Sequence, residues 1–226
     1  MIGKTKIPWC DYSLNPIKGL CPVACEDLEG KEYCYARRMY KRFKWNPEIR
    51  LANNAFYQFY ELKRKKPSKV FVGSTMELFG PWVKDEWMHG ILSYCKAYSQ
   101  HTFIFLTKYP QEMGKWEFPD NCWVGASADT YYHMFKATRW LPEVQARIKF
   151  ISFEPLLESV AGVRFNLQGI DWVILGSRTA PVRHPKPEWV REIIAAADKA
   201  GIPVFVKSPL SDFMGIQRQE FPKRLI

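Results

Sequence analysis

The chain lacks several features that would place it in a class at once. It has no run of about 18 apolar residues, so no segment is expected to span a membrane. Its first residues lack the apolar stretch of a signal peptide, and no fixed-period repeat or low-complexity linker occurs. We therefore expect a cytoplasmic protein, in a reducing compartment that keeps thiols available for metals. The length favours a single domain over residues 1–226, with a substantial core.

Acidic residues are in deficit. The chain has 33 Lys and Arg against 23 Asp and Glu, a formal net charge of +10. Such an excess favours an anionic partner, such as a nucleic acid or a phosphorylated substrate, over a neutral one. A Lys-rich surface that serves only solubility is the alternative. The content of 47% hydrophobic and 15% aromatic residues argues against disorder.

A second close pair of cysteines is also absent, and this directs attention to three cysteines near the N-terminus. Three residues separate Cys21 from Cys25, and eight separate Cys25 from Cys34. Three thiolates are one short of a closed four-ligand zinc or iron–sulfur site, so one coordination position is left open for chemistry. Cys10 is an unfavourable fourth ligand, because four-cysteine zinc sites typically use two closely spaced pairs.

Hydrophobic runs alternate with amphipathic segments along the rest of the chain. Strands are predicted over residues 12–17, 69–73, 102–106, 122–125, 148–153, 172–175 and 203–206. Helices are predicted over residues 37–66 with a break near 46–47, 84–98, 130–146 with a break at 142, and 187–200. Near-continuous apolar strands between helices are typical of a parallel sheet buried on both faces. Six or seven such units predict an α/β fold, a full or partial (β/α) barrel of the TIM type, with a doubly wound open sheet as the alternative. Cys95 and Cys122 fall in these elements and are predicted to be core residues.

Polar residues follow the predicted strands again and again. Because the active site of a β/α barrel lies at the carboxyl ends of its strands, these residues are expected to converge on one mouth. Glu154 stands out, since a carboxylate between Phe153 and Pro155 is hard to solvate unless it faces a cavity or a partner. The strand-end candidates are Ser74, Thr75, Lys108, Ser127, Glu154, Arg178 and Lys207.

The cysteine loop, about residues 19–36, resembles the cluster-binding loop of the radical S-adenosylmethionine (SAM) superfamily. Its first interval matches the common C-x3-C-x2-C spacing, and the aromatic Tyr33 stands just before the third cysteine. The second interval is longer by six residues, and the polar segment 26–31 is interpreted as a surface insertion. The resemblance implies a 4Fe–4S cluster on Cys21, Cys25 and Cys34, with SAM on the fourth iron.

Strand-end segments extend the resemblance over nearly the whole chain. The segments VFVGST, FLTKYP, FISFEPLL and DWVILG are similar to those of a phage and archaeal family of short radical-SAM-like proteins without an assigned substrate. A looser likeness is to spore photoproduct lyase, a radical SAM enzyme that acts on a DNA lesion. Gly-Ser-Thr stands where the superfamily usually has Gly-Gly-Glu. The pattern implies that the cofactor contacts are Tyr33 at adenine, Ser74 and Thr75 at the amino group, Lys108 and Ser127 at the carboxylate and ribose, and Glu154 at a ribose hydroxyl.

The resemblance thus implies an enzyme that cleaves SAM reductively and uses a 5′-deoxyadenosyl radical to abstract hydrogen from its substrate. This chemistry implies an electron donor of the flavodoxin or ferredoxin type. An anionic substrate, such as a nucleic acid or nucleotide, is expected to meet Arg37, Arg38, Arg178 and Lys207. The basic run 37–44, with interleaved aromatics, suits a phosphate backbone, or is only a solvated helix face. The alternatives are a nucleic-acid-binding protein with a structural zinc site and a metal-free barrel enzyme.

Overall fold

The computed structural model describes residues 2–160, 162 and 165–223. By its contacts the chain divides into two compact units, which are treated separately below. The first unit comprises Met1–Thr107 with Trp116–Trp123, and the second comprises Lys108–Lys115 with Val124–Ile226. Among the described residues, no helix combines the length and the apolar character needed to cross a membrane.

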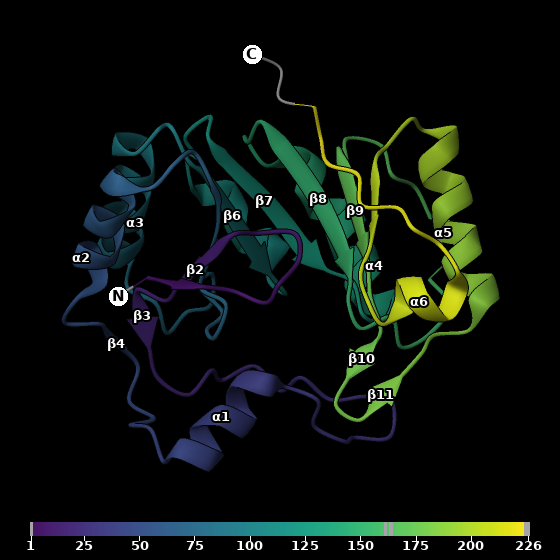
Figure 1. Cartoon of the computed structure of the whole chain (residues 1–226), viewed down its shortest axis with the longest axis horizontal. Helices are drawn as coiled ribbons and strands as arrows, with labels where there is room; N and C mark the ends of the chain where they lie inside the picture. The colour runs from purple at the N-terminus through teal and green to yellow at the C-terminus, as the bar shows by residue number, and fades with distance from the viewer. Residues whose placement is uncertain (1, 161, 163–164, 224–226) are drawn as a thin grey trace. The chain divides into compact units, whose positions relative to one another are not determined.

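The strands of the first unit follow the order β1-β2-β5-β6. Their bounds are β1 Gly3–Lys4, β2 Tyr12–Leu14, β5 Lys69–Val72 and β6 Thr102–Thr107. β5 pairs in parallel with both β2 and β6, whereas β1 is antiparallel to β2. Helices α2 (Ala55–Tyr60) and α3 (Asp85–Ala97) lie side by side (Figure 1). Phe59 of α2 packs its ring 5.5 Å from Tyr94 and 5.7 Å from Phe103, and these contacts join both helices to β6.

The first unit also holds helix α1 (Tyr35–Phe43) and a two-stranded ribbon of β3 (Ile17–Lys18) and β4 (Arg50–Leu51). The predicted strand 12–17 is therefore divided into β2 and β3, because Pro16 has no N–H to donate to a ladder. The predicted helix 37–66 is also divided. α1 ends at Phe43, its C-cap residue Lys44 is left-handed with φ 49°, and Asn46-Pro47 follows.

The strands of the second unit follow the order β7-β8-β9-β12. Their bounds are β7 Cys122–Ser127, which begins among the last residues of the first unit, β8 Ile148–Phe153, β9 Trp172–Leu175 and β12 Val204–Val206. β9 pairs in parallel with both β8 and β12. Trp172 is fully buried and packs against Phe150 and Phe205 on the two neighbouring strands. The second unit also contains α4 (Tyr131–Trp140), the hairpin β10 (Arg178–Thr179) and β11 (Val182–Arg183), α5 (Pro187–Lys199) and α6 (Leu210–Met214).

The predicted α/β class with mainly parallel strands is confirmed, but a closed barrel is not found among the described residues. A closed barrel would need parallel strand partners at the edges of β2 and β12. Antiparallel segments occupy both of these edges. In the first unit β1 covers the edge of β2. In the second unit the C-terminal segment covers β12, since Val206 N donates to Arg218 O at 2.8 Å and Glu220 N donates to Val204 O at 3.1 Å (Figure 1). The single-domain assignment stays a prediction.

Cys95 and Cys122 were predicted to be core residues, and both are fully buried in the first unit. Burial raises the pKa of the Cys95 thiol well above its usual value, and contact with Cys122 adds to the effect. Cys95 is therefore a protonated packing group, and both residues differ in environment from the N-terminal cysteines.

Candidate functional site

Cys21, Cys25 and Cys34 lie in the first unit, on the segment between β3 and α1. Cys21 is 8% exposed, and the other two are half-buried. None of the six cysteines, all within the described residues, forms a disulfide. Among those residues, no group of three or more His, Cys, Asp and Glu side chains is gathered so as to hold one metal ion.

The six extra residues between Cys25 and Cys34 form a closed turn. The buried carboxylate of Asp27 accepts hydrogen bonds from the amides of Glu29 at 3.0 Å and Lys31 at 2.9 Å. Glu26 and Glu32 pair as an antiparallel bridge, and Tyr33 N donates to Cys25 O at 2.9 Å. The turn thus returns the chain to its starting point, and the insertion leaves the two cysteines beside each other.

Cys34 occupies the N-cap of α1, so its side chain stands where the helix has unpaired amides. Its pKa is lowered to about 6, first by a hydrogen bond from Cys25, against the opposing effect of burial. The backbone amides of Arg37 and Ala36 and the charge of Arg37 lower it further. Cys34 is therefore largely a thiolate at neutral pH.

Cys21 has the opposite environment. Burial raises the pKa of its thiol, although the amides of Glu77 and Val23 oppose the shift by hydrogen bonding to the sulfur. Glu77 N lies 3.4 Å from Cys21 Sγ. The arrangement supplies amide donors to a sulfur that becomes a good anionic ligand once a metal replaces its proton.

Two side chains of helix α1 also hold the backbone of the cysteine loop in place. Arg37 Nη2 donates to Cys21 O at 2.9 Å, and its guanidinium lies 3.7 Å from the Glu32 carboxylate. The buried Tyr40 hydroxyl accepts from Gly19 N at 2.8 Å. Gly19 has φ +129°, and a Cβ there would lie 2.6 Å from the backbone of Ile49, so only glycine fits.

Of the predicted substrate residues in the first unit, Arg37 is thus engaged with the cysteine loop. Arg38 is half-buried on the same helix, and its amide bonds Cys34 O at 3.3 Å. Tyr33 is half-buried beside the cysteines. Their proposed contacts with substrate or adenine stay predictions.

The end of β5 lies against the cysteine loop. The hydroxyl of Tyr35, next to Cys34, donates to Ser74 O, and the Glu77 amide reaches Cys21 as described. Thr75 donates from its amide at 3.0 Å and from its hydroxyl at 2.9 Å to Asn15 Oδ1. The structure therefore brings the predicted strand-end residues Ser74 and Thr75 together with the cysteines inside one unit.

Sequence reasoning missed Asn15 and Glu77 in this region. Asn15 Nδ2 lies 3.1 Å from Ser74 Oγ, which joins the ends of β2 and β5. The buried Glu77 carboxylate accepts from Thr107 Oγ1 at 2.6 Å and from Phe79 N at 3.0 Å. The position of Glu77 directly after the Gly-Ser-Thr segment was the available signal.

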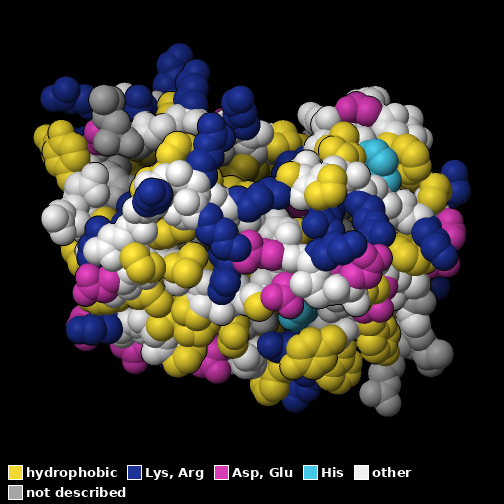
Figure 2. Space-filling model, turned by 90° about the horizontal axis from the view of Figure 1, so that it is seen from below, with side chains coloured by type: hydrophobic (Ala, Val, Ile, Leu, Met, Phe, Trp, Pro, Cys, Tyr) yellow, Lys and Arg dark blue, Asp and Glu magenta, His cyan; other side chains and the backbone are white. Residues whose placement is uncertain are grey.

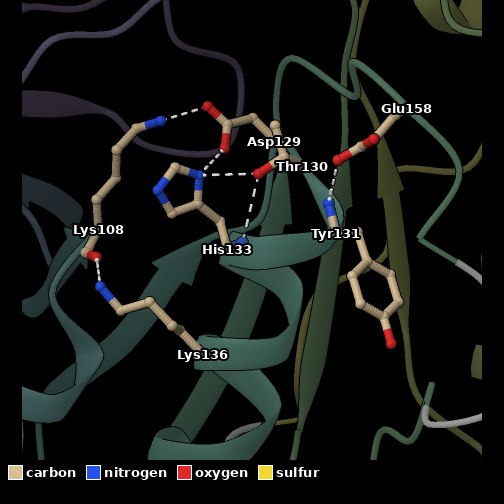
Figure 3. A network of polar contacts seen from close by, with 7 residues as sticks. All are labelled: Lys108, Asp129, Thr130, Tyr131, His133, Lys136 and Glu158. Carbon is tan, nitrogen blue, oxygen red and sulfur yellow. Dashed lines mark hydrogen bonds and ion pairs between the residues drawn. The ribbon is translucent and has the colours of Figure 1, made fainter. Parts of the chain in front are cut away.

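In the second unit, Lys108 takes part in a buried network that the sequence did not predict (Figure 3). Its ammonium pairs with Asp129, which is 2% exposed and also pairs with the His133 ring. Burial opposes ionisation of Asp129, but the hydrogen bond from His133 and the charge of Lys108 prevail and hold its pKa well below its usual value. Asp129 thus fixes the orientation of the ammonium and the imidazole. Ser127, two residues before Asp129, ends β7 and is half-buried.

Two further predicted residues of the second unit pair with each other: the Glu154 carboxylate binds the Lys207 ammonium. Gly176 makes room for this pair, because a Cβ there would lie 2.8 Å from Glu154 Cγ. Arg178 is buried at the start of β10. The predicted cofactor and substrate contacts of Glu154, Lys207 and Arg178 stay predictions.

Comparison with protein families gives one match over most of the chain. A family model described as a protein of unknown function (DUF5131) matches residues 4–215. No curated protein matches the chain.

Solved structures of spore photoproduct lyase are similar to the chain. A mutant with bound AdoMet and dinucleoside spore photoproduct has a TM-score of 0.52 at 15% identity, over 88% of this chain and 64% of that one. Another mutant, with dinucleoside spore photoproduct, has a TM-score of 0.54 at 15% identity and the same coverage. The chain therefore shares the fold of this radical SAM enzyme and spans 64% of its length.

Proposed function

The chain belongs to the DUF5131 family of proteins of unknown function, and we propose that it is a radical SAM enzyme. The observation that carries the proposal is the contact between the cysteine loop and the end of β5. Tyr35 bonds Ser74 O and the Glu77 amide bonds Cys21 Sγ, so three cysteines and a polar strand end form one site within the first unit. The shared fold with spore photoproduct lyase supports the same interpretation. The narrower likeness to a phage and archaeal family stays a prediction.

The cysteine loop suits a 4Fe–4S cluster. The three thiolates of such a cluster bind three different iron atoms, so they need not surround a single point. The described residues contain no group of side chains gathered to hold a single metal ion. Cys34 is already acidic, and backbone amides face the sulfur of Cys21. Hydrogen bonds to the sulfurs are among the features that set the reduction potential of such clusters.

We propose that Ser74 and Thr75 hold the amino group of SAM and that Tyr33 lies near its adenine. Asn15 orients both hydroxyl-bearing residues, because its amide group contacts Ser74 Oγ and Thr75 Oγ1. The corresponding roles of Lys108, Ser127 and Glu154 in the second unit are proposed from the superfamily pattern alone.

When bound, the cluster and SAM supply a 5′-deoxyadenosyl radical that abstracts hydrogen from the substrate. The residues of this chain bind and orient these groups. Arg37 and Tyr40 hold the loop backbone, and the turn at Asp27 holds Cys25 beside Cys34. One-electron reduction requires a donor of the flavodoxin or ferredoxin class, and the net charge of +10 favours an anionic substrate, a nucleic acid or nucleotide.

Metal analysis tests the proposal. After anaerobic reconstitution, the protein is expected to hold about four irons per chain. Cys21→Ala, Cys25→Ala and Cys34→Ala should each lose the cluster, whereas Cys10→Ala is the matched control and should retain it. One zinc per chain without iron would instead support a structural zinc site, the alternative function.

A further inference from the structure

Helix α4 in the second unit has an outward face of unusual composition. Met134 and Ala137 are fully buried and face the core. At about 100° per residue, the opposite arc contains only aromatic and basic side chains. Tyr132 is 63% exposed, and Tyr131, Phe135 and Trp140 are each 40% or 41% exposed. The residues of this arc, called the α4 face below, are Tyr131, Tyr132, Phe135, Lys136, Arg139 and Trp140.

Helix stability does not account for the α4 face. Aromatic residues are weaker helix formers than the Glu, Lys, Gln and Ala that usually occupy exposed helix positions. Phe135 is 41% exposed, so its ring gains only part of the burial that would offset this cost. The helix has no acidic residue, so the half-buried Lys136 and the exposed Arg139 both add positive charge to this face. An exposed apolar cluster of this kind marks an interaction surface.

The cations of the α4 face lie against its rings. Lys136 Nζ lies 5.1 Å from the centroid of Tyr109 and 5.5 Å from that of Tyr132, and it also donates to Lys108 O at 3.1 Å (Figure 3). Arg139 Cζ lies 4.8 Å from the centroid of Trp140. Each cation of the α4 face thus lies beside an aromatic ring, so the face offers stacking surfaces and positive charge close together.

We propose that the α4 face binds single-stranded nucleic acid, with bases stacked on its rings and phosphates at Lys136 and Arg139. Ten helical residues at about 1.5 Å each extend over about 15 Å. At about 3.4 Å per nucleotide, this length suits roughly four nucleotides.

Charge decides in favour of a polyanion over a protein partner. The chain carries a net charge of +10, and the face seen in Figure 2 shows Lys and Arg spread among hydrophobic and acidic side chains. The α4 face, by contrast, has only cations among its charged residues. It is also distinct from the basic run 37–44, where Tyr40 is buried and Arg37 is tied to the cysteine loop. This binding does not depend on the proposed radical chemistry.

Fluorescence anisotropy with the full chain and a labelled mixed-sequence single strand of about 12 nucleotides tests the proposal. Phe135→Leu keeps an apolar side chain but removes the stacking ring, and we expect affinity to fall about 5- to 100-fold. Arg139→Ala should reduce the slope of log affinity against log salt by about 0.7, the loss of one phosphate contact. Arg191→Ala is the matched control, because it removes the same charge from an exposed position on α5.

Three results would overturn the proposal. They are no binding of the single strand at low salt, an equal effect of Arg139→Ala and Arg191→Ala, or unchanged affinity in Phe135→Leu. Tighter binding of a duplex, of anionic vesicles or of a protein would equally assign the α4 face to another partner. Thermal melting of each variant separates these results from loss of folding, and iron content is measured independently.

Discussion

The closed turn between Cys25 and Cys34 can be tested by removing its buried carboxylate. Asp27→Ala deletes the acceptor of two amide hydrogen bonds, at 3.0 and 2.9 Å. A hydrogen bond to a charged group contributes about 1.5–3 kcal/mol, but the amides belong to the exposed residues Glu29 and Lys31, which water reaches. We therefore take the lower range and expect a loss of about 2 kcal/mol, roughly a 30-fold shift from the closed to the open turn.

The expected result is a protein that folds but retains its cluster poorly. After reconstitution, iron loss to a chelator should be about 30-fold faster in Asp27→Ala than in the unchanged chain, if opening of the turn precedes release. Asp27→Asn is the matched control, because its amide oxygen still accepts both hydrogen bonds, and iron loss should be much less affected. Circular dichroism melting checks that the rest of the chain is intact.

Equal iron retention in Asp27→Ala and the unchanged chain would refute this reasoning. The turn would then not govern how Cys25 and Cys34 present their sulfurs. Equal loss in Asp27→Asn and Asp27→Ala would show that the negative charge matters and the acceptor geometry does not.

Three further predictions follow from the site. Asp129→Asn should lower the free energy of unfolding in urea by about 3 kcal/mol, because it leaves the largely buried Lys108 ammonium without its counter-charge. Since the folded-state pKa of Asp129 is depressed, its contribution to stability is fully present above its unfolded pKa of about 4 and is lost as pH falls. The unchanged chain should therefore lose stability below pH ~4, and Asp129→Asn should lose less. In the metal-free chain, alkylation of Cys34 followed by mass spectrometry should rise with a midpoint near pH 6, whereas a midpoint above pH 8 would contradict the lowered pKa of about 6. Gly176→Ala should destabilise the chain by about 1–3 kcal/mol in the same urea assay through its contact with Glu154, while Gly114→Ala, with no atom within 4 Å of the added Cβ, should not.

Continuous apolar runs made the strands predictable. β8 and β9 have the predicted bounds, because residues 148–153 and 172–175 are almost wholly apolar and buried. Whether the strands close into a barrel was not predictable in the same way. It depends on which segments cover β2 and β12, and the segments that do so, β1 and residues 218–220, are short and carry no strand pattern. The hairpin β10–β11 and helix α6 were also missed, because these elements are too short to show a clear pattern.

The candidate site was predictable where residues are close in the sequence and not where they meet through folding. The three cysteines and the residues after β5 stand out by spacing. Asn15 and Thr107 join the site only through hydrogen bonds to residues about 60 and 30 positions away. Asp129 and His133, spaced i,i+4 after a strand, offered a usable local signal that the strand-end reasoning passed over in favour of Ser127.

The most direct test of the account is formation of 5′-deoxyadenosine. The anaerobically reconstituted protein is incubated with SAM and a one-electron reductant, and the nucleoside is measured by liquid chromatography and mass spectrometry. The account predicts 5′-deoxyadenosine from the unchanged chain and from Cys10→Ala, and none from Cys34→Ala. An iron-loaded protein that forms no 5′-deoxyadenosine, or equal formation by Cys34→Ala, would contradict it.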